Sequence, residues 1–267
     1  MPTLVWVLNL TPDSFSDGRD RSETSLWEVI QSLIDDGADM IDVGAEATWP
    51  HSTEVSEEEE LTRLDEFFNI AWGYEIPFSL DTMKSGIARR WLEAGIKMIN
   101  DVSWGRADPE MFSLMADSDA QYVMMYCKNP TGRADLKETK HKDIVTHVSV
   151  FFDVQIEQAL QAGMRREQLI LDPGMWSFVS TDPDDSRALL QAIPALRERY
   201  GLPLYVGTSR KWFLGKKSHD LWSRDRVGST LASSVYALAQ WAEYVRVHDV
   251  RWMRQFLDIQ AYLDEHK

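Results

Sequence analysis

Eight short apolar runs recur along the chain, separated by segments whose apolar residues follow helical spacing. The runs cover residues 3–9, 39–45, 76–81, 97–101, 120–126, 168–172, 203–208 and 243–248. Strands that alternate with amphipathic helices are typical of βα units in a parallel sheet. Eight such units predict an α/β fold, the closed (β/α)₈ TIM barrel. An open, doubly wound sheet is the alternative that the alternation leaves open.

The segments between the runs carry the signals of helix ends. Four glycines each stand a few residues before a predicted strand, as helix C-termini require: Gly37, Gly95, Gly163 and Gly201. The acidic run Glu57–Glu60 is interpreted as the first turn of a helix, where carboxylates favour the helix dipole, rather than as a binding site.

Composition limits the domain count and the kind of partner. The 267 residues contain no Pro/Gly/Ser-rich linker, so a single domain over residues 1–267 is expected. The sequence has no apolar segment of 18 residues, so no membrane span is predicted. A net charge of −15 disfavours nucleic acid and anionic membranes as partners. Cys127 is the only cysteine and no secretory signal is recognisable, which predicts a cytoplasmic protein. An anionic substrate would therefore need a local basic cluster.

Polar side chains stand at or just past the end of every predicted strand. In chain order they are Asn9, Glu46 with Thr48, Asp81, Asn100 with Asp101, Tyr126, Asp172, Ser209 to Lys211, and Arg246 with His248. In a barrel the active site lies at the carboxyl ends of the strands. Each residue alone is equally well read as a cap or turn residue, but the whole set predicts convergence on one face.

The chemistry of this set suggests two kinds of ligand group. The last two strands supply four basic side chains, in the usual place for a phosphate site: Arg210, Lys211, Arg246 and His248. Asp81, Asp172 and Asn100 are suited to the N–H edges of a heterocycle. Asn9 offers a neutral oxygen to a Mg²⁺ ion that already carries phosphate oxygens. We therefore expect a small-molecule substrate with a polar ring and a phosphate or diphosphate.

Six motifs at predicted strand ends carry a family resemblance. They are Asn9–Gly18 (NLTPDSFSDG), Ser79–Thr82 (SLDT), Ile99–Val102 (INDV), Leu171–Gly174 (LDPG), Ser209–Lys211 (SRK) and Arg246–Asp249 (RVHD). In their order and spacing the chain resembles dihydropteroate synthase over essentially its whole length. The resemblance implies a barrel that joins 6-hydroxymethyl-7,8-dihydropterin diphosphate to p-aminobenzoate and releases diphosphate, in folate synthesis. It also implies a homodimer through the last helices.

The resemblance assigns roles to individual residues. It implies that the pterin is held by Asp81, Asn100, Met125, Asp172 and Lys211. It implies that the diphosphate is held by Arg246, by His248 and, through Mg²⁺, by Asn9. The reaction resembles departure of diphosphate to leave a pterin-methyl cation, which the amine attacks. The catalytic candidates are Asp13 and Asp17, on a loop that closes over the site in the family, together with Lys211.

The departures from the family pattern cluster on the p-aminobenzoate side. Ala47-Thr48-Trp49-Pro50 replaces the usual Ser-Thr-Arg-Pro, and Met175 to Val179 replaces Gly-Phe-Gly-Lys. Trp212 replaces a common serine, and Tyr126 a frequent histidine. The residues expected on this side are Phe15, Thr48, Trp49, Pro50, Trp176, Ser209, Arg210 and Trp212. They predict a remodelled amine subsite, although tryptophans that merely pack loops are the alternative.

Two hypotheses on function remain open at this level. The run 171–180 is similar to sulfonamide-insensitive members of the family, so a synthase that resists sulfonamides is one hypothesis. The other is a paralogue that binds a pterin without this condensation, either as a binding protein or as a pterin-dependent methyltransferase. The intact loop Thr11–Gly18 and the pair Arg246/His248 favour the synthase, because a substrate without diphosphate would not need them.

Overall fold

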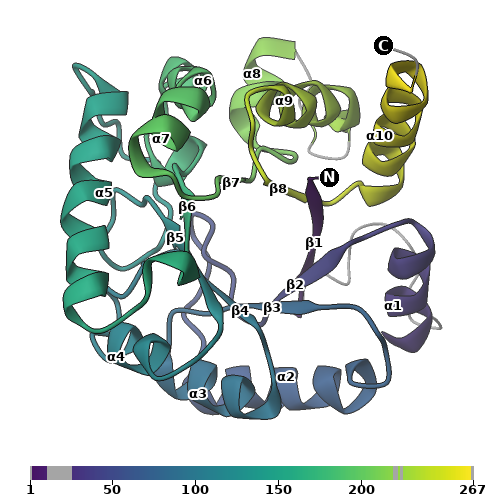
Figure 1. Ribbon diagram of the computed structural model, residues 1–267, viewed down its shortest axis with the longest axis vertical. Coiled ribbons are helices and arrows are strands. Elements are labelled where there is room, and N and C mark those ends of the chain that lie inside the picture. Colours follow the sequence, from purple (N-terminus) through teal and green to yellow (C-terminus); the bar gives the residue numbers. More distant parts are fainter. Residues whose placement is uncertain (1, 11–25, 219–221, 223–224, 266–267) are drawn as a thin grey trace.

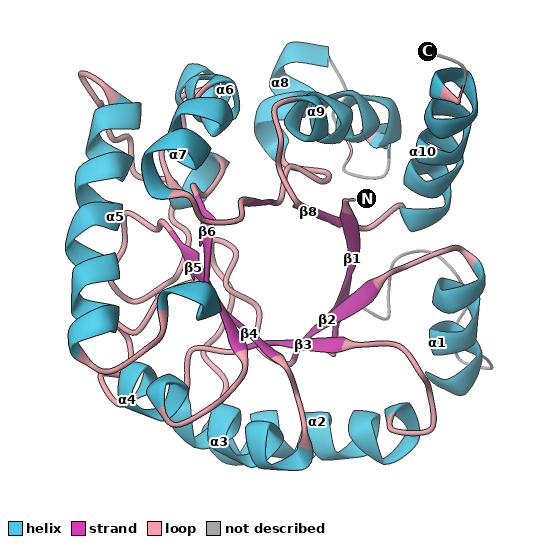
Figure 2. Ribbon diagram, in the orientation of Figure 1, coloured by secondary structure: helices cyan, strands magenta, loops and turns pink. Residues whose placement is uncertain are grey.

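One or two α-helices follow each strand in the described chain, and the strands form a ring enclosed by the helices (Figures 1 and 2). The computed structural model describes residues 2–10, 26–218, 222 and 225–265. The strands are β1 (Thr3–Asn9), β2 (Met40–Gly44), β3 (Phe78–Asp81), β4 (Met98–Asp101), β5 (Gln121–Met125), β6 (Leu169–Asp172), β7 (Tyr205–Val206) and β8 (Tyr244–Val247). All eight predicted strands are confirmed.

The strands form one parallel sheet that curls into a nearly closed barrel. Its order is β6-β5-β4-β3-β2-β1-β8-β7, so the first strand pairs with both the second and the eighth. A parallel bridge between Leu171 and Leu204 links the two ends of the sheet, and the Leu171 N–H donates to the Pro203 carbonyl at 2.9 Å. This closure confirms the (β/α)₈ barrel, and the open-sheet alternative is wrong.

Ten α-helices are described between and after these strands. They are α1 (Leu26–Asp35), α2 (Glu57–Ala71), α3 (Ser85–Ala94), α4 (Met111–Ala116), α5 (Ile144–Gln161), α6 (Pro183–Gln191), α7 (Ile193–Tyr200), α8 (Trp212–Ser218), α9 (Val227–Ala239) and α10 (Val250–Asp264). Two short 3₁₀ helices, η2 (Arg166–Gln168) and η3 (Trp176–Phe178), flank β6. No helix in this part of the chain is long and apolar enough to cross a membrane.

The helix boundaries follow the signals in the sequence. The Ser56 hydroxyl caps α2 by accepting the Glu59 N–H at 3.2 Å, so the acidic run does form a first helical turn. Gly95 and Gly201 end α3 and α7 in the left-handed region, with φ of 112° and 59°. The β7 strand is much shorter than predicted, because the run 203–208 is interrupted by Pro203 and Gly207.

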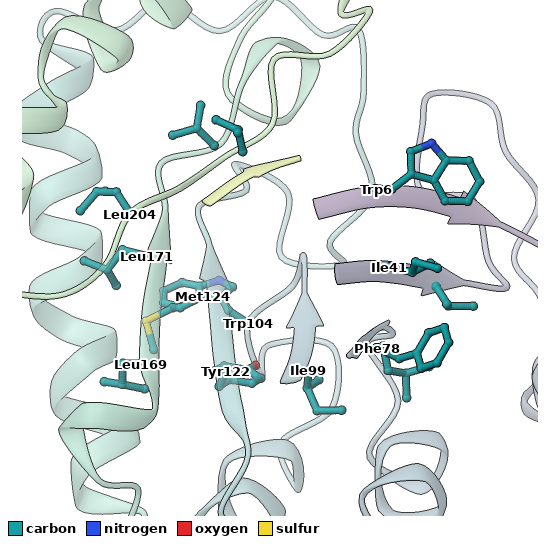
Figure 3. Close-up of a cluster of buried hydrophobic side chains, with 14 of the residues drawn as sticks. Trp6, Ile41, Phe78, Ile99, Trp104, Tyr122, Met124, Leu169, Leu171 and Leu204 are labelled. Carbon is teal, nitrogen blue, oxygen red and sulfur yellow. The ribbon is translucent and has the colours of Figure 1, made fainter. Parts of the chain in front are cut away.

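Two apolar layers hold the barrel together. Residues on the outer face of the strands, such as Trp6, Ile41, Tyr122 and Leu169, point away from the barrel axis toward the helices (Figure 3). A separate cluster fills the interior of the barrel: Val5, Met98, Val123, Ile170 and Tyr205. Because strand residues alternate between the two faces, the next inward positions lie nearer the carboxyl ends, above this plug.

Candidate active site

A cavity of about 100 Å³ lies above the interior plug, at the carboxyl ends of the strands. Nine of the residues predicted for the site line it: Thr48, Asp81, Asn100, Met125, Asp172, Ser209, Lys211, Arg246 and His248. The strand ends on which the sequence places most of them therefore do converge. Asp13, Phe15 and Asp17 lie outside the described residues.

Arg246 organises the charged floor of this cavity. Its Nε donates to Asp42 Oδ2 at 2.7 Å, and one of its terminal nitrogens donates to Asp81 Oδ2 at 2.8 Å. Asn100 Nδ2 donates to the same Asp42 oxygen at 3.0 Å. Charge-assisted hydrogen bonds inside the barrel thereby link β2, β3, β4 and β8.

Asp42, which lies beneath the cavity as the partner of Arg246, is a charged residue that sequence reasoning missed. The lining residues Val7 and Gly207 were missed as well. Asp42 lies within β2 rather than at its end, and its side chain is fully buried. The signal available in the sequence is a carboxylate inside an apolar run. Met40 and Gly44 stand two residues before and after Asp42, so all three point to the same, inward side of the strand. A buried charge of this kind requires a partner, and Arg246 supplies it.

Burial changes the titration of both carboxylates that line the cavity. It raises the pKa of Asp81 to about 7, against the lowering effect of the Arg246 charge and with a further rise from Asp42. It raises the pKa of Asp172 to about 6, against a hydrogen bond from the Gly174 N–H at 2.8 Å. Each group therefore changes charge near neutral pH.

Lys211 lies opposite these carboxylates. Burial lowers the pKa of its ammonium to about 8, and the nearby charge of Asp172 opposes that shift. The ammonium also lies 4.8 Å from the centre of the Phe178 ring, a favourable cation–π position. Lys211 is thus a cation that loses its proton only slightly above neutral pH.

The basic cluster expected from the last two strands carries less free charge than the sequence suggests. Burial, with the charges of Arg210 and Arg246, lowers the pKa of His248 to about 3, so its ring is neutral at pH 7. Its Nδ1 lies 2.9 Å from the Ser209 hydroxyl. The same hydroxyl accepts a hydrogen bond from the backbone N–H of His248 at 3.1 Å. Arg210 pairs with Asp249 at 2.7 Å and does not line the cavity.

Other residues predicted for the amine side lie beyond the cavity wall. The Trp176 and Trp212 rings are 6.1 Å apart and tilted by 32°, with the Lys216 ammonium 5.4 Å from the Trp212 ring. Trp49 is 58% exposed, whereas Pro50 is buried. Of the described residues assigned to this side, only Thr48 and Ser209 reach the cavity.

The expectation that every polar strand-end residue faces the site is wrong for Arg210, which pairs with Asp249, and for three further residues. Asp101 faces outward, where it accepts the Tyr122 hydroxyl at 2.7 Å and backbone N–H groups of the following turn. Tyr126 packs edge-on against Phe151, also on the outer side. Glu46 turns to Lys84 at 2.6 Å. Successive strand residues point to opposite faces, so neighbours such as Asn100 and Asp101 cannot both reach the cavity.

Asn9 is the residue predicted to bind Mg²⁺, and its amide oxygen is a type of ligand that this ion accepts. It ends β1 at the same edge of the barrel, but it is not among the residues that line the cavity. Within the described ranges, no group of three or more His, Cys, Asp or Glu could hold a metal ion. Oxygens of a phosphorylated ligand and water are ligands that a Mg²⁺ ion bound through Asn9 would accept at its remaining positions.

Carboxylates, an amide and a lysine converge at the carboxyl ends of the strands. In (β/α)₈-barrel enzymes this end of the barrel holds the active site. The family model described as "Pterin binding enzyme" matches residues 5–248, and this chain belongs to that family. It is 36% identical over 265 residues to dihydropteroate synthase type-3 of Escherichia coli, covering 98% of this chain and 100% of that protein.

Solved structures of dihydropteroate synthases have the same fold as this chain. Dihydropteroate synthase of Xanthomonas albilineans with 4-aminobenzoic acid superposes with a TM-score of 0.89 at 31% identity, over 100% of this chain and 94% of that chain. The same enzyme in complex with 7,8-dihydropteroate gives a TM-score of 0.84 at 30% identity, over 100% and 95% of the two chains. The family predicted from the strand-end motifs is therefore confirmed.

Proposed function

We propose that this protein is a dihydropteroate synthase, a transferase that joins 6-hydroxymethyl-7,8-dihydropterin diphosphate to p-aminobenzoate. The observation that carries the proposal is the convergence of Asp81, Asn100, Asp172 and Lys211 on one cavity, in a chain whose full-length relatives have this activity. A pterin-binding paralogue without the activity is not favoured, since the similar structures that bind aminobenzoate or dihydropteroate are synthases.

The proposed pterin subsite is the cavity itself. Ionised Asp81 and Asp172 accept N–H groups of the ring, Asn100 both donates and accepts, and Lys211 donates to a ring acceptor. Met125 supplies an apolar contact. A ligand that bonds these groups adds hydrogen bonds to charges that are largely removed from water, which favours binding.

The proposed diphosphate subsite lies beside it. If the Ser209 hydroxyl donates to His248 Nδ1, the other ring nitrogen of His248 carries the proton and donates to a phosphate oxygen. Arg246 supplies the fixed positive charge, and Asn9 is proposed to bind the ion that the diphosphate carries. Mg²⁺, when bound, would stabilise negative charge on the leaving group.

The bond changes of the proposed reaction balance as follows. The C–O bond between the pterin methylene and the diphosphate breaks, and the electron pair leaves with the diphosphate. The amine nitrogen of p-aminobenzoate then bonds to the methylene carbon and loses a proton. We propose Asp13 and Asp17 as the carboxylates that stabilise the positive carbon. Lys211, which lies at the cavity, completes the proposed catalytic set.

We propose that the amine enters over Thr48 and Ser209, with Phe15, Trp49, Pro50, Trp176, Arg210 and Trp212 on that side. We propose that residues 1–267 form a single domain and that the protein has no nucleic-acid partner. A cytoplasmic location stays a prediction.

A homodimer is supported by the outer face of α10. Trp252, Phe256, Ile259 and Leu263 follow helical spacing and are all exposed in the single chain. An apolar stripe of this kind at the surface favours burial against a second copy of the chain.

The activity is tested by measuring diphosphate release from pterin diphosphate with and without p-aminobenzoate. The proposal predicts release that depends on the amine and saturates with it. Tight binding of the pterin diphosphate without such release would instead support the paralogue.

A further inference from the structure

The segment between β2 and α2, residues 45–56, carries the proposed amine-side residues Thr48 and Trp49. It has little regular structure of its own: Ser52 Oγ donates to the Ala47 carbonyl at 2.6 Å, and the Ser52 N–H donates to the Trp49 carbonyl at 3.2 Å. A segment held only by such local bonds needs outside contacts to keep one position.

Arg133, in the loop between β5 and α5, supplies several of these outside contacts, and Arg63 adds another by donating to the Ala45 carbonyl at 2.7 Å. One terminal nitrogen of the Arg133 guanidinium donates to the Ala47 carbonyl at 3.3 Å and to the Ser52 hydroxyl at 3.1 Å. The other pairs with Glu46. The next residue continues the contact, since the Ala134 N–H donates to the Thr48 carbonyl at 2.9 Å.

The other oxygen of Glu46 is held from a second side. The Glu46 side chain is only 6% exposed, and its Oε2 accepts from Lys84 at 2.6 Å. Lys84 also donates to Glu60 Oε2 at 2.5 Å and to the Val55 carbonyl at 2.9 Å, so the two cations hold both ends of segment 45–56. Charged partners that are largely removed from water make such pairs costly to break singly.

The loop that carries Arg133 is itself shaped for close approach. Gly132 has a φ of +73°, and a Cβ there would lie 2.3 Å from the Met83 sulfur and 2.8 Å from Ser103 Cβ. Glycine therefore lets this loop, which carries Arg133, pack against the turns after β3 and β4.

We propose that Arg133 is a positioning residue for the amine acceptor. It does not line the cavity, and it acts by holding segment 45–56 so that Thr48 and Trp49 form the wall over which p-aminobenzoate enters. The inference rests on the proposed synthase function. A planar guanidinium with several N–H donors bonds Glu46, Ala47 and Ser52 at once, which a lysine ammonium cannot match in geometry.

The test compares Arg133→Met and Arg133→Lys with the wild type, and Arg90→Met serves as the matched control. Arg90 pairs with Asp65 on the exposed helical surface, away from the cavity. For Arg133→Met we expect the KM for p-aminobenzoate to rise about tenfold, while the KM for the pterin diphosphate stays within about twofold. Arg133→Lys, which keeps the charge but not the fork, should recover part of the loss.

Hydrogen exchange provides a readout that does not depend on activity. In Arg133→Met, the backbone amides of residues 45–56 should exchange faster than in the wild type, while those of β3 and β4 stay unchanged. Unchanged exchange in this segment, or an equal rise in both KM values, would overturn the inference. A wild type without turnover would overturn the synthase proposal, and the exchange data would still decide whether Arg133 holds the segment.

Discussion

At the scale of single residues, the cavity places ionisable groups where burial opposes their charge. Asp172 is buried and Lys211 is partly buried, and loss of solvation shifts the pKa of each toward neutrality, to about 6 and about 8. Such shifts are typical of sites that use charge to bind or to react, because a structure selected for stability alone would avoid them. The same groups therefore link affinity, pH dependence and stability.

Asp172→Asn separates binding from stability. The neutral amide cannot accept N–H groups of the pterin as a carboxylate does, so affinity for the pterin diphosphate should fall about a hundredfold. Calorimetric titration measures this change. Asp65→Asn, on the exposed Arg90 pair, is the control that should bind like the wild type. Wild-type affinity in Asp172→Asn would remove Asp172 from the subsite.

The same variant should be more stable than the wild type at pH 8. A carboxyl whose folded pKa is raised from 3.8 to about 6 contributes stability at low pH that is lost as the pH rises through 6. Replacing it removes this loss, for a gain of about 1 to 3 kcal/mol at pH 8 that narrows toward pH 5. Urea unfolding at the two pH values measures the difference, and a destabilised variant at pH 8 would contradict the account.

The pH dependence of catalysis follows from three groups. Asp172 and Asp81 become ionised as the pH passes about 6 and about 7, and Lys211 loses its proton near 8. We expect kcat/KM for the pterin diphosphate to rise between about pH 6 and pH 7, as the two carboxyls ionise, and to fall above about pH 8, as Lys211 loses its proton. Comparison with Asp172→Asn cancels the titration of the substrate, and an identical acid limb in both proteins would argue against Asp172.

At the scale of elements, the sequence predicts strands well and side-chain direction less well. All eight strands and the glycine-ended helices were recognisable, because burial and left-handed caps leave local signals. Asp42 and Arg133 were not found. Asp42 lies inside a strand, and the role of Arg133 depends on a loop contact 87 residues away from Glu46. Long-range pairing of this kind leaves no local pattern.

The η3 turn offers a test of the amine side. Trp176 has a φ of +53°, so Trp176→Gly fits the backbone and removes the ring that lies beside Trp212. If this turn excludes sulfonamides, the ratio of the sulfonamide inhibition constant to the KM for p-aminobenzoate should fall about tenfold in the variant. A wild type that sulfonamides inhibit as strongly as they do ordinary synthases would sink the idea.

At the scale of the whole molecule, the barrel separates its surfaces. The cavity lies at the carboxyl ends of the strands. Helix α10, whose apolar stripe is exposed in the single chain, lies on the flank of the barrel (Figure 1). We expect Ile259→Glu to place a charge in the dimer interface and convert the protein to a monomer in sedimentation experiments. Thr62→Glu, on the exposed face of α2, is the control that should stay dimeric. A wild type that is already monomeric would contradict the proposed dimer.

We propose that the protein binds the pterin diphosphate in this one cavity and transfers its methylene group to an amine. Mass spectrometry of a reaction with pterin diphosphate and p-aminobenzoate tests it most directly. The account predicts 7,8-dihydropteroate and diphosphate in equal amounts, with both products lost in Lys211→Ala. Diphosphate released without dihydropteroate, or a Lys211→Ala variant that matches the wild type, would contradict it.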